Sequence, residues 1–442
     1  MPAIKPAFDD RGYFFRHSSQ NSPRSWETGF CAGAVAGSGA VAGAVAGSGS
    51  VAGAASGGPF LVGRPGHWWA ARESAHTLRV ETPPLRWIDP PEGPAIALLD
   101  QTRLPAAEAI VTCGDVPALV DAIRRLVVRG APMLGVAGAF GVALAAYRRD
   151  DVAAAAAEIE QARPTAVNLG WGVRRALAAY RRALHNQTDG PERVAARAVV
   201  AEARSIEAED AAASAAMAEN GLALVPEDAR VLTHCNTGAL VSGGEGTAFA
   251  VILAAHRAGR LAKLWIDETR PLLQGARLTA YEAQRAGMPH AVLADSAAAS
   301  LLAAGAVDII LTGADRIAAD GSVANKVGTY GLAVLASHHG VPFVVVAPVS
   351  TVDLDTPEGA AIKVEQRPAD EVTSLAGVRI APEETPGYNP AFDVTPPELI
   401  TAIVTERGVA KPPTAGTLRV LTAGSGKLDG AAAAVYVERW GP

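Results

Sequence analysis

Residues 230–266 read RVLTHCNTGALVSGGEGTAFAVILAAHRAGRLAKLWI, and this stretch decides the fold. Short apolar runs at 231–233 and 263–266 flank a segment, 246–259, whose apolar residues recur at helical spacing. Three further apolar runs continue the pattern, at 291–293, 307–311 and 343–346. Helical stretches separate them, near 274–286, 295–304 and 328–339. Strands that alternate with helices in this way predict βαβ units and a parallel, Rossmann-like sheet.

The chain before residue 230 predicts a mainly helical domain. Apolar runs at 95–99 and 107–111 indicate two short strands, and apolar side chains recur at helical spacing over 116–128. Pro132 suits the first turn of a second helix, and Ala-rich helices should follow near 151–162, 168–185 and 192–222. The predicted fold class is therefore α/β. It comprises a helical N-terminal domain with a small β-sheet (86–225), a Rossmann-like catalytic domain (226–410) and a C-terminal extension (411–442).

Residues 1–70 have a different composition from the rest of the chain. No charged residue occurs from Thr28 to Gly63, and AVAGSG appears at 34–39 and again at 44–49. Gly and Ser interrupt this segment too often for a membrane span, and it lacks the Leu-rich core of a secretory signal. We therefore predict a disordered, low-complexity extension, with no membrane partner.

Composition favours a small-molecule substrate over a polymer. The net charge is −6 with no basic run, and aromatic residues make up only 5% of the chain, so a nucleic-acid partner is not expected. The three cysteines are widely spaced, which argues against a disulfide framework or a Cys-rich zinc site and favours a reducing cytoplasm. The histidines form no metal pattern and no P-loop sequence is present, so no metal and no cofactor are predicted.

Cys235 directly follows the first predicted strand of the parallel sheet, within LTHCNTG. Ligands bind such sheets at the carboxyl ends of their strands. The turn after Cys235 and the glycines Gly243, Gly244 and Gly246 offer backbone N–H groups that suit a phosphate or an oxyanion. A helix N-terminus also lowers the pKa of a nearby thiol. The alternative is a buried structural cysteine followed by a flexible loop.

Asp315 follows the strand predicted at 307–311, and Asn325 and Lys326 come ten residues later. A carboxylic acid can protonate a sugar oxygen, while an amide and an ammonium can hold hydroxyls or a phosphate. The alternatives are a helix cap or an ion pair with Arg316 for Asp315, and a solvated surface charge for Lys326.

Arginines of the helical domain are candidate phosphate ligands. Arg129, Gly130 and Ala131 join two predicted helices, so the Arg129 side chain and a helix N-terminus could hold one phosphate together. Arg163 is a second candidate cation. Either arginine could instead form an interdomain salt bridge. Gln274 stands where a loop enters a helix, and could bond a sugar hydroxyl or cap that helix.

Six phrases taken together resemble the methylthioribose-1-phosphate isomerases: RGAPMLGVAGAFGVALA, RPTAVNLGW, LTHCNTGAL, ETRPLLQGARLTA, GADRIAADGSVANKVGTYGLA and NPAFDVTPPELI. That family shares its fold with ribose-1,5-bisphosphate isomerases and with regulatory subunits of a eukaryotic translation-initiation exchange factor. The likeness covers residues 99–407. It departs at Met133 and Leu134, where the family usually carries smaller or β-branched residues, and at Glu245, where many members have an aromatic residue.

The resemblance implies specific roles. It implies Cys235 and Asp315 as the catalytic pair, with Asp315 as the proton donor. It implies that the substrate is held by Arg129, Gly130, Ala131, Arg163, Gln274, Asn325 and Lys326. It further implies a homodimer in methionine salvage, with no metal and no nucleotide cofactor. Two alternatives stay open: isomerisation of ribose-1,5-bisphosphate or 5-deoxyribose-1-phosphate, and a non-catalytic sugar-phosphate or nucleotide sensor on the same fold.

Overall fold

The computed structural model describes residues 83–186 and 190–423, so the extension predicted at 1–70 lies outside the described residues. The described chain opens with a three-stranded antiparallel sheet. Its strands are β1 (Leu85–Ile88), β2 (Ala95–Leu99) and β3 (Ile110–Cys113), in the order β1-β2-β3. The strand predicted at 95–99 is confirmed. The one predicted at 107–111 begins later, at Ile110.

Helices then form the first hydrophobic core. They are α1 (Val116–Arg124), α2 (Ala131–Arg148), α3 (Val152–Glu160), α4 (Val167–His185) and α5 (Pro191–Leu222). Asp115 caps α1 by accepting a hydrogen bond from the amide of Ala118. Gly172 of α4 lies so close to α2 that a Cβ on it would stand 2.7 Å from the carbonyl carbon of Gly135. Small residues therefore let α2 and α4 pack closely.

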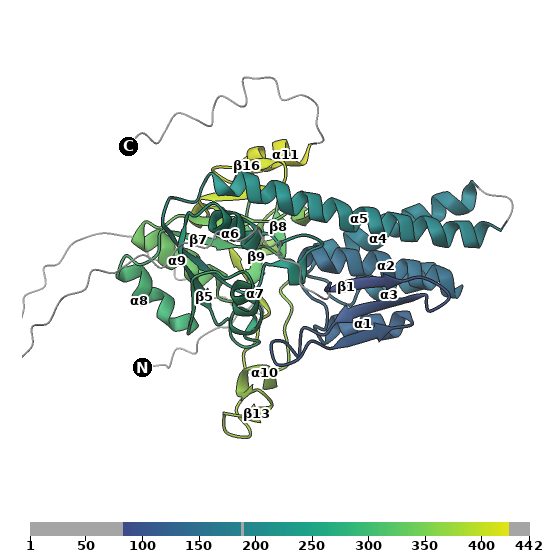
Figure 1. Cartoon of the computed structure of the whole chain (residues 1–442), viewed down its shortest axis with the longest axis horizontal. Helices are drawn as coiled ribbons and strands as arrows, with labels where there is room; N and C mark the ends of the chain where they lie inside the picture. Colours follow the sequence, from purple (N-terminus) through teal and green to yellow (C-terminus); the bar gives the residue numbers. More distant parts are fainter. Residues whose placement is uncertain (1–82, 187–189, 424–442) are drawn as a thin grey trace, which may run out of the picture. The chain divides into compact units, whose positions relative to one another are not determined.

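Helix α2 is long and apolar enough, by length and composition, to cross a membrane. However, 89% of that helix is buried inside the protein, where it packs against α4 and α5 (Figure 1). Its apolar character is therefore accounted for by its place at the centre of the helical core.

The second half of the described chain is built on a seven-stranded sheet. Its strands are β4 (Ala229–Thr233), β5 (Leu261–Asp267), β6 (His290–Leu293), β7 (Ile309–Thr312), β10 (Phe343–Val346), β15 (Ala402–Thr405) and β16 (Gly408–Ala410). They run in the order β16-β15-β10-β7-β4-β5-β6, and all neighbours pair in parallel except β15 and β16. The predicted parallel sheet is confirmed, although its last two strands were not predicted.

The direction in which strands are added to this sheet reverses between β6 and β7. Strands β4, β5 and β6 follow one another towards one edge, and β7, β10 and β15 follow one another towards the opposite edge. Strands β4 and β7 are therefore neighbours at a topological switch point. Ligands bind at such points, beyond the carboxyl ends of the strands. Cys235 follows β4 and Asp315 follows β7, so the topology brings both to one place.

Four helices connect these strands: α6 (Ala248–Arg257), α7 (Ala280–Arg285), α8 (Ala298–Ala303) and α9 (Thr329–His339). The helix predicted at 274–286 is not regular. Its first part is a π-helical turn, Gly275–Thr279, which leads into α7. Such turns are rare and frequently lie at functional sites.

A second, four-stranded sheet was not predicted. It comprises β8 (Arg316–Ala318), β9 (Val323–Lys326), β11 (Val352–Asp353) and β14 (Phe392–Thr395), in the order β11-β8-β9-β14. These strands are only two to four residues long, too short to show a clear period in the sequence. Strand β8 starts directly after Asp315, and β9 ends at Lys326, so this sheet positions two candidate site residues.

Two further segments complete the described chain. Residues 370–379 form a short helix, α10 (Asp370–Thr373), and a hairpin of β12 (Ser374–Leu375) and β13 (Val378–Arg379). Helix α11 (Ala415–Thr422) begins within the predicted C-terminal extension, and its Leu418 is fully buried against the large sheet. The start of that extension therefore packs on the protein.

Helix α5 belongs to both cores. Ala203 and Ile206 pack in the helical core, whereas Ala213 and Met217 pack with residues of the large sheet. The helix runs from one core to the other (Figure 1). Helix α5 therefore holds the helical core in place relative to the large sheet and the end of β4.

Candidate active site

One pocket lies at the carboxyl ends of β4 and β7, and residues of both halves of the described chain line it. It contains both candidate catalytic residues, Cys235 and Asp315. It also contains all seven candidate substrate ligands: Arg129, Gly130, Ala131, Arg163, Gln274, Asn325 and Lys326. Residues that are far apart in the sequence are therefore brought together as the sequence predicted.

Cys235 adopts a left-handed backbone conformation, with φ of 63°. A non-glycine residue pays roughly 1–2 kcal/mol for that conformation. Bonds on both sides hold it: its amide donates to Thr269 Oγ1 at 2.8 Å, and its carbonyl accepts from Thr279 Oγ1 at 2.6 Å. Its Sγ lies 3.4 Å from Nη2 of Arg129. The fold thus turns the thiol towards a cation at the pocket wall, unlike a structural cysteine.

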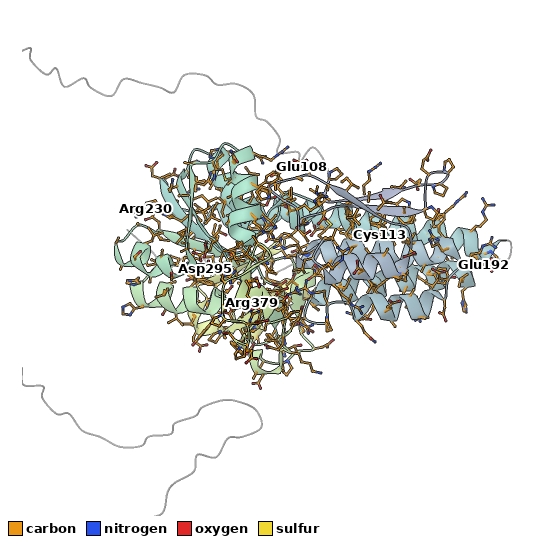
Figure 2. The ribbon with its side chains drawn as sticks, turned by 90° about the horizontal axis from the view of Figure 1, so that it is seen from below. Glu108, Cys113, Glu192, Arg230, Asp295 and Arg379 are labelled. Atoms are coloured by element: carbon orange, nitrogen blue, oxygen red, sulfur yellow. The ribbon has the colours of Figure 1, made fainter. Side chains whose placement is uncertain are left out.

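Cys113 provides the contrast. It lies in β3, fully buried in the helical core, and burial raises the pKa of its thiol to about 11. Figure 2 shows Cys113 on the blue helical part of the ribbon and Asp295 on the green part that carries the large sheet. Cys113 is thus a packing residue outside the pocket.

Arg129 reaches from the helical half to the turn after β4. Its Nη1 donates to Oδ1 of Asn236 at 2.8 Å, and its Nη2 donates to the carbonyl of Asn236 at 3.2 Å. These bonds to an amide and a carbonyl replace the interdomain salt bridge considered as the alternative. Gly130, with φ of 87°, then leads into α2, whose first residues line the pocket.

The prediction that the glycine-rich segment faces an anion is wrong for Gly243 and Gly244. The amide of Gly243 donates to Asp210 Oδ2 at 2.6 Å, and the amide of Gly244 donates to Ser242 Oγ at 3.0 Å. Since α5 supplies Asp210 beside the loop, these N–H groups bond to side chains of the protein and are not available to a substrate phosphate. From this region the pocket is lined by Asn236, Thr237, Val241 and Thr247.

Asp315 has neither of the structural roles considered for it. Arg316 pairs with Asp353 at 2.6 Å, and the chain continues from Asp315 into a strand, so Asp315 caps no helix. Burial raises the pKa of the Asp315 carboxyl, and the positive charges of Arg163, Arg129 and Lys326 partly offset this rise. A carboxyl placed in this way is poised to hold and donate a proton.

Lys326 is buried, not a solvated surface charge, with 5% of its surface exposed. Burial lowers the pKa of its ammonium, and the nearby Cys235 acts in the opposite direction. Its neighbour Asn325 donates from Nδ2 to Thr329 Oγ1 at 2.9 Å, which fixes the amide at the start of α9. Both residues end β9, so the small sheet sets their position.

Arg163 combines two functions that the sequence offered as alternatives. Its Nε pairs with Oε2 of Glu365 at 3.0 Å, and its guanidinium carbon lies 5.9 Å from the ring centroid of Phe392. The same arginine lines the pocket. It therefore links the two halves of the chain and contributes positive charge to the site.

Gln274 does not cap the helix that follows it, because its side chain makes no capping bond. Its Oε1 is buried, and no described group donates to it. An unpaired buried acceptor costs roughly 1–3 kcal/mol. A hydroxyl bound in the pocket would remove that cost, which fits the predicted contact of Gln274 with a sugar.

Comparison with known proteins places the chain in a family. It is 48% identical to the methylthioribose-1-phosphate isomerase of Heliobacterium modesticaldum over 347 residues, which are 76% of this chain and 98% of that protein. The chain belongs to the methylthioribose-1-phosphate isomerase family. It also matches the Initiation factor 2 subunit family over residues 127–412.

Solved structures agree with this placement. The crystal structure of 5-methylthioribose 1-phosphate isomerase from Pyrococcus horikoshii OT3 is similar, with 40% identity and a TM-score of 0.69 over 77% of this chain and 96% of that chain. A structure named as translation initiation factor eIF-2B, subunit delta, from A. fulgidus is also similar, with 38% identity and a TM-score of 0.64 over 77% and 99%. The expected fold shared with translation-factor subunits is thereby confirmed.

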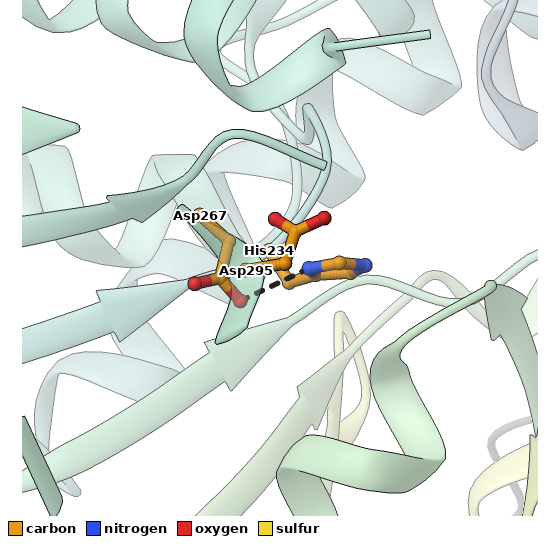
Figure 3. Close-up of side chains that lie close together, drawn as sticks. All are labelled: His234, Asp267 and Asp295. Atoms are coloured by element: carbon orange, nitrogen blue, oxygen red, sulfur yellow. Dashed lines mark hydrogen bonds and ion pairs between the residues drawn. The ribbon is translucent and has the colours of Figure 1, made fainter. Parts of the chain in front are cut away.

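A cluster behind Cys235 was missed from the sequence. Nδ1 of His234 lies 3.1 Å from Oδ2 of Asp267 (Figure 3). Its Nε2 lies 2.9 Å from the carbonyl oxygen of Val327. Asp295 completes the cluster, and its carboxylate accepts from the amides of Thr269 and Arg270. Most of the donor atoms that a metal would need are thus bonded within the protein.

The cluster joins three elements beneath the pocket. The His234 ring connects the end of β4 to β5 and to the residue after Lys326. Burial alone would lower the pKa of His234, but the hydrogen bond and charge of Asp267 raise it overall. His234 and Asp267 are 33 positions apart, so their spacing in the sequence gives no sign of the pair. The pair becomes visible only once β4 and β5 are known to be neighbours.

Proposed function

We propose that this chain is an aldose–ketose isomerase that converts 5-methylthioribose 1-phosphate into 5-methylthioribulose 1-phosphate in methionine salvage. One observation carries the proposal. The thiol of Cys235 and the carboxyl of Asp315 follow neighbouring strands at the switch point of the sheet and line the same cationic pocket. The match to relatives that are named for this reaction covers nearly the whole length of those relatives.

The proposed chemistry begins with ring opening. A phosphate on C1 prevents the sugar from opening to a free aldehyde, so the ring oxygen must be protonated first. Asp315 supplies that proton, since its burial favours the protonated carboxyl. The hydrogen on C2 must then move to C1, while the C2 hydroxyl releases its proton to the Asp315 carboxylate that ring opening leaves behind. Cys235 is placed to carry the C2 hydrogen as a proton through an enolate-like intermediate, and a direct hydride shift is the alternative route.

Cations at the pocket support a phosphate dianion. Arg129 and Lys326 are buried there, and the N-terminus of α2 adds backbone N–H groups and a positive dipole end. In a partly dehydrated pocket such charges act more strongly than in water. We propose that these groups hold the phosphate while C1 and C2 face Cys235.

A single phosphate fits better than two. An adjoining cavity of about 600 Å³ shares five residues with the pocket: Leu126, Arg129, Leu272, Gln274 and Arg367. Of the arginines that line it, Arg277 bonds to backbone carbonyls, Arg125 to Asp121 and Arg367 to Glu371, whereas the exposed Arg103 has no bonded partner among the described side chains. A second phosphate would have to compete with protein groups for Arg277, Arg125 and Arg367 and would find only Arg103 unbonded among the described arginines there, which favours an uncharged substituent on C5 over ribose-1,5-bisphosphate.

Two variants test the proposal. Asp315→Asn and Cys235→Ala should each reduce kcat by roughly 10²–10⁴-fold while calorimetry still detects binding of the substrate. Asp355→Asn, a change at an exposed aspartate, is the matched control and should keep wild-type turnover. Wild-type rates in both pocket variants would refute the assignment. Turnover of the three candidate sugars by the wild-type protein would separate the alternatives, and binding without product would indicate a sensor.

We further propose a cytoplasmic homodimer that works without metal, cofactor, nucleic acid or membrane. The family resemblance supports the dimer, and composition supports the rest: the chain is mildly acidic, poor in aromatic residues and sparse in cysteine. Light scattering of the purified protein would measure its mass in solution. A monomer at micromolar concentration would contradict the expected assembly.

A further inference from the structure

Glu282 is a buried acid to which the proposed chemistry gives no role. It lies on α7, and only 4% of its surface is exposed. Its Oε2 accepts from Nδ2 of Asn236 at 2.5 Å, and its Oε1 accepts from the amide of Leu240 at 3.1 Å. Gly238 makes room for it, because a Cβ there would stand 2.5 Å from the carboxylate carbon. The turn after β4 is thus wrapped around this carboxylate.

Asn236 connects Glu282 to Arg129. Its amide oxygen can only accept, and it faces the guanidinium at 2.8 Å. Its amide nitrogen can only donate, and it faces the carboxylate. The orientation of the amide is therefore set by a cation on one side and an anion on the other. All three side chains are at least nine-tenths buried.

This arrangement leaves Glu282 without a directly bonded cation. Burial raises the pKa of its carboxyl to about 7, while the hydrogen bonds from Asn236 and Leu240 and the charge of Arg129 act to lower it. Arg129 is the charged side chain that acts on Glu282, and it approaches from the helical half of the chain. The charge on Glu282 should therefore change near neutral pH.

We propose that Glu282 is a positioning residue of this site, which acts through Asn236 to hold the Arg129 guanidinium against Cys235 and towards the phosphate. The inference rests on the proposed function. When Glu282 is ionised, the relay carries a full charge at each end, and Arg129 has one favoured orientation. When Glu282 is protonated, Asn236 faces a neutral acid, and the guanidinium is held less firmly. Binding of the phosphate should therefore weaken as pH falls through about 7.

The test compares Glu282→Gln with Glu207→Gln over pH 5.5–9. Glu207 is a second carboxyl whose pKa burial raises, and it lies on α5, so it is the matched control. A glutamine keeps the size of Glu282 but removes its charge. Its NH₂ group would face either the N–H of Leu240 or Nδ2 of Asn236, and both of these groups are donors too. Loss of one charge-assisted bond predicts a KM about 10–100-fold higher at pH 8, with a smaller change in kcat.

The shape of the pH profile separates positioning from folding. In the wild type and E207Q, kcat/KM should fall below about pH 7, whereas in E282Q this acid limb should be smaller and set by the second ionisation of the substrate phosphate near about pH 6. Titration with inorganic phosphate should show the same loss of affinity in E282Q. If E282Q does not fold, Glu282→Asp withdraws the charge by one methylene and should raise KM in the same direction.

The role of Glu282 and the isomerase activity can fail separately. A wild-type KM and an unchanged acid limb in folded E282Q or E282D would refute the role of Glu282 and leave the isomerase intact. Failure of the wild type to convert any of the three sugars would refute the proposed function. The phosphate titration would then still decide whether Glu282 controls Arg129.

Discussion

A methyl group added at Gly130 should disrupt the pocket more than its size suggests. Gly130 lies between Arg129 and α2, with φ of 87° and ψ of 138°. This is a region that side-chain-bearing residues rarely adopt. A Cβ there would stand 2.5 Å from Cγ1 of Val241 and 3.2 Å from its Cα. Val241 belongs to the turn that follows β4, so the clash falls between the two halves of the pocket.

The magnitude follows from two separate costs. Forcing Ala into this backbone conformation costs about 1–3 kcal/mol. Pushing a methyl group into packed atoms costs typically about 1–3 kcal/mol more. The free energy of unfolding of Gly130→Ala should therefore fall by about 2–6 kcal/mol, a large share of the roughly 5–15 kcal/mol of an ordinary domain. If α2 shifts to relieve the clash, KM should rise, since Gly130 and Ala131 line the pocket.

Two control glycines separate the costs. Gly259 has φ of +74° with nothing near its missing Cβ, so Gly259→Ala reports backbone strain alone. Gly331, inside α9, has neither strain nor a neighbour, so Gly331→Ala should be neutral or stabilising by up to about 1 kcal/mol. Urea unfolding followed by circular dichroism measures all three, and steady-state kinetics gives KM. A Gly130→Ala loss no larger than that of Gly259→Ala would show that the contact with Val241 is not tight.

Three other changes test other parts of the site. Gln274→Leu removes a buried acceptor that no described group satisfies, so the unfolding free energy should hold or rise while KM rises about tenfold or more. Turnover in deuterated water should place deuterium on C1 if a proton is transferred, and none if a hydride shifts. Asp267→Asn removes the group that raises the pKa of His234, and the stability that this pair contributes is present below about pH 6.5 and lost as pH rises through the higher folded pKa. The wild type should therefore exceed this variant in urea stability by more at pH 6 than at pH 9.

The sequence could predict the sheet and the place of the chemistry because both follow from local patterns. Short apolar runs between helical stretches identify parallel strands, and a general rule assigns function to their carboxyl ends. Cys235 and Asp315 each directly follow such a run, so the sequence could place both at the same edge of the sheet. What the pattern could not supply was that β4 and β7 are neighbours.

The features that the sequence missed depend on partners distant along the chain. The glycines after Cys235 suited an anion site, but Asp210 of α5 bonds the amide of Gly243 instead. Lys326 would ordinarily be solvated, yet a sheet of very short strands buries it. Neither contact leaves a period or a motif in the sequence. They arise only when separate elements pack together.

Two layers of residues therefore make this pocket. Cys235, Asp315 and Arg129 face the cavity, and their residue types alone suggested chemistry. Behind them, Glu282 acts on Arg129, and Asp267 holds His234 beneath Cys235. An acid at the surface would be solvated and would interact only weakly with its partner. A buried acid such as Glu282 or Asp267 interacts through a low dielectric constant and holds its partner in one orientation. The first layer determines which reaction is possible, and the second determines whether its groups stand in the required orientation, so substitutions in the second layer should alter KM and pH dependence before they abolish turnover.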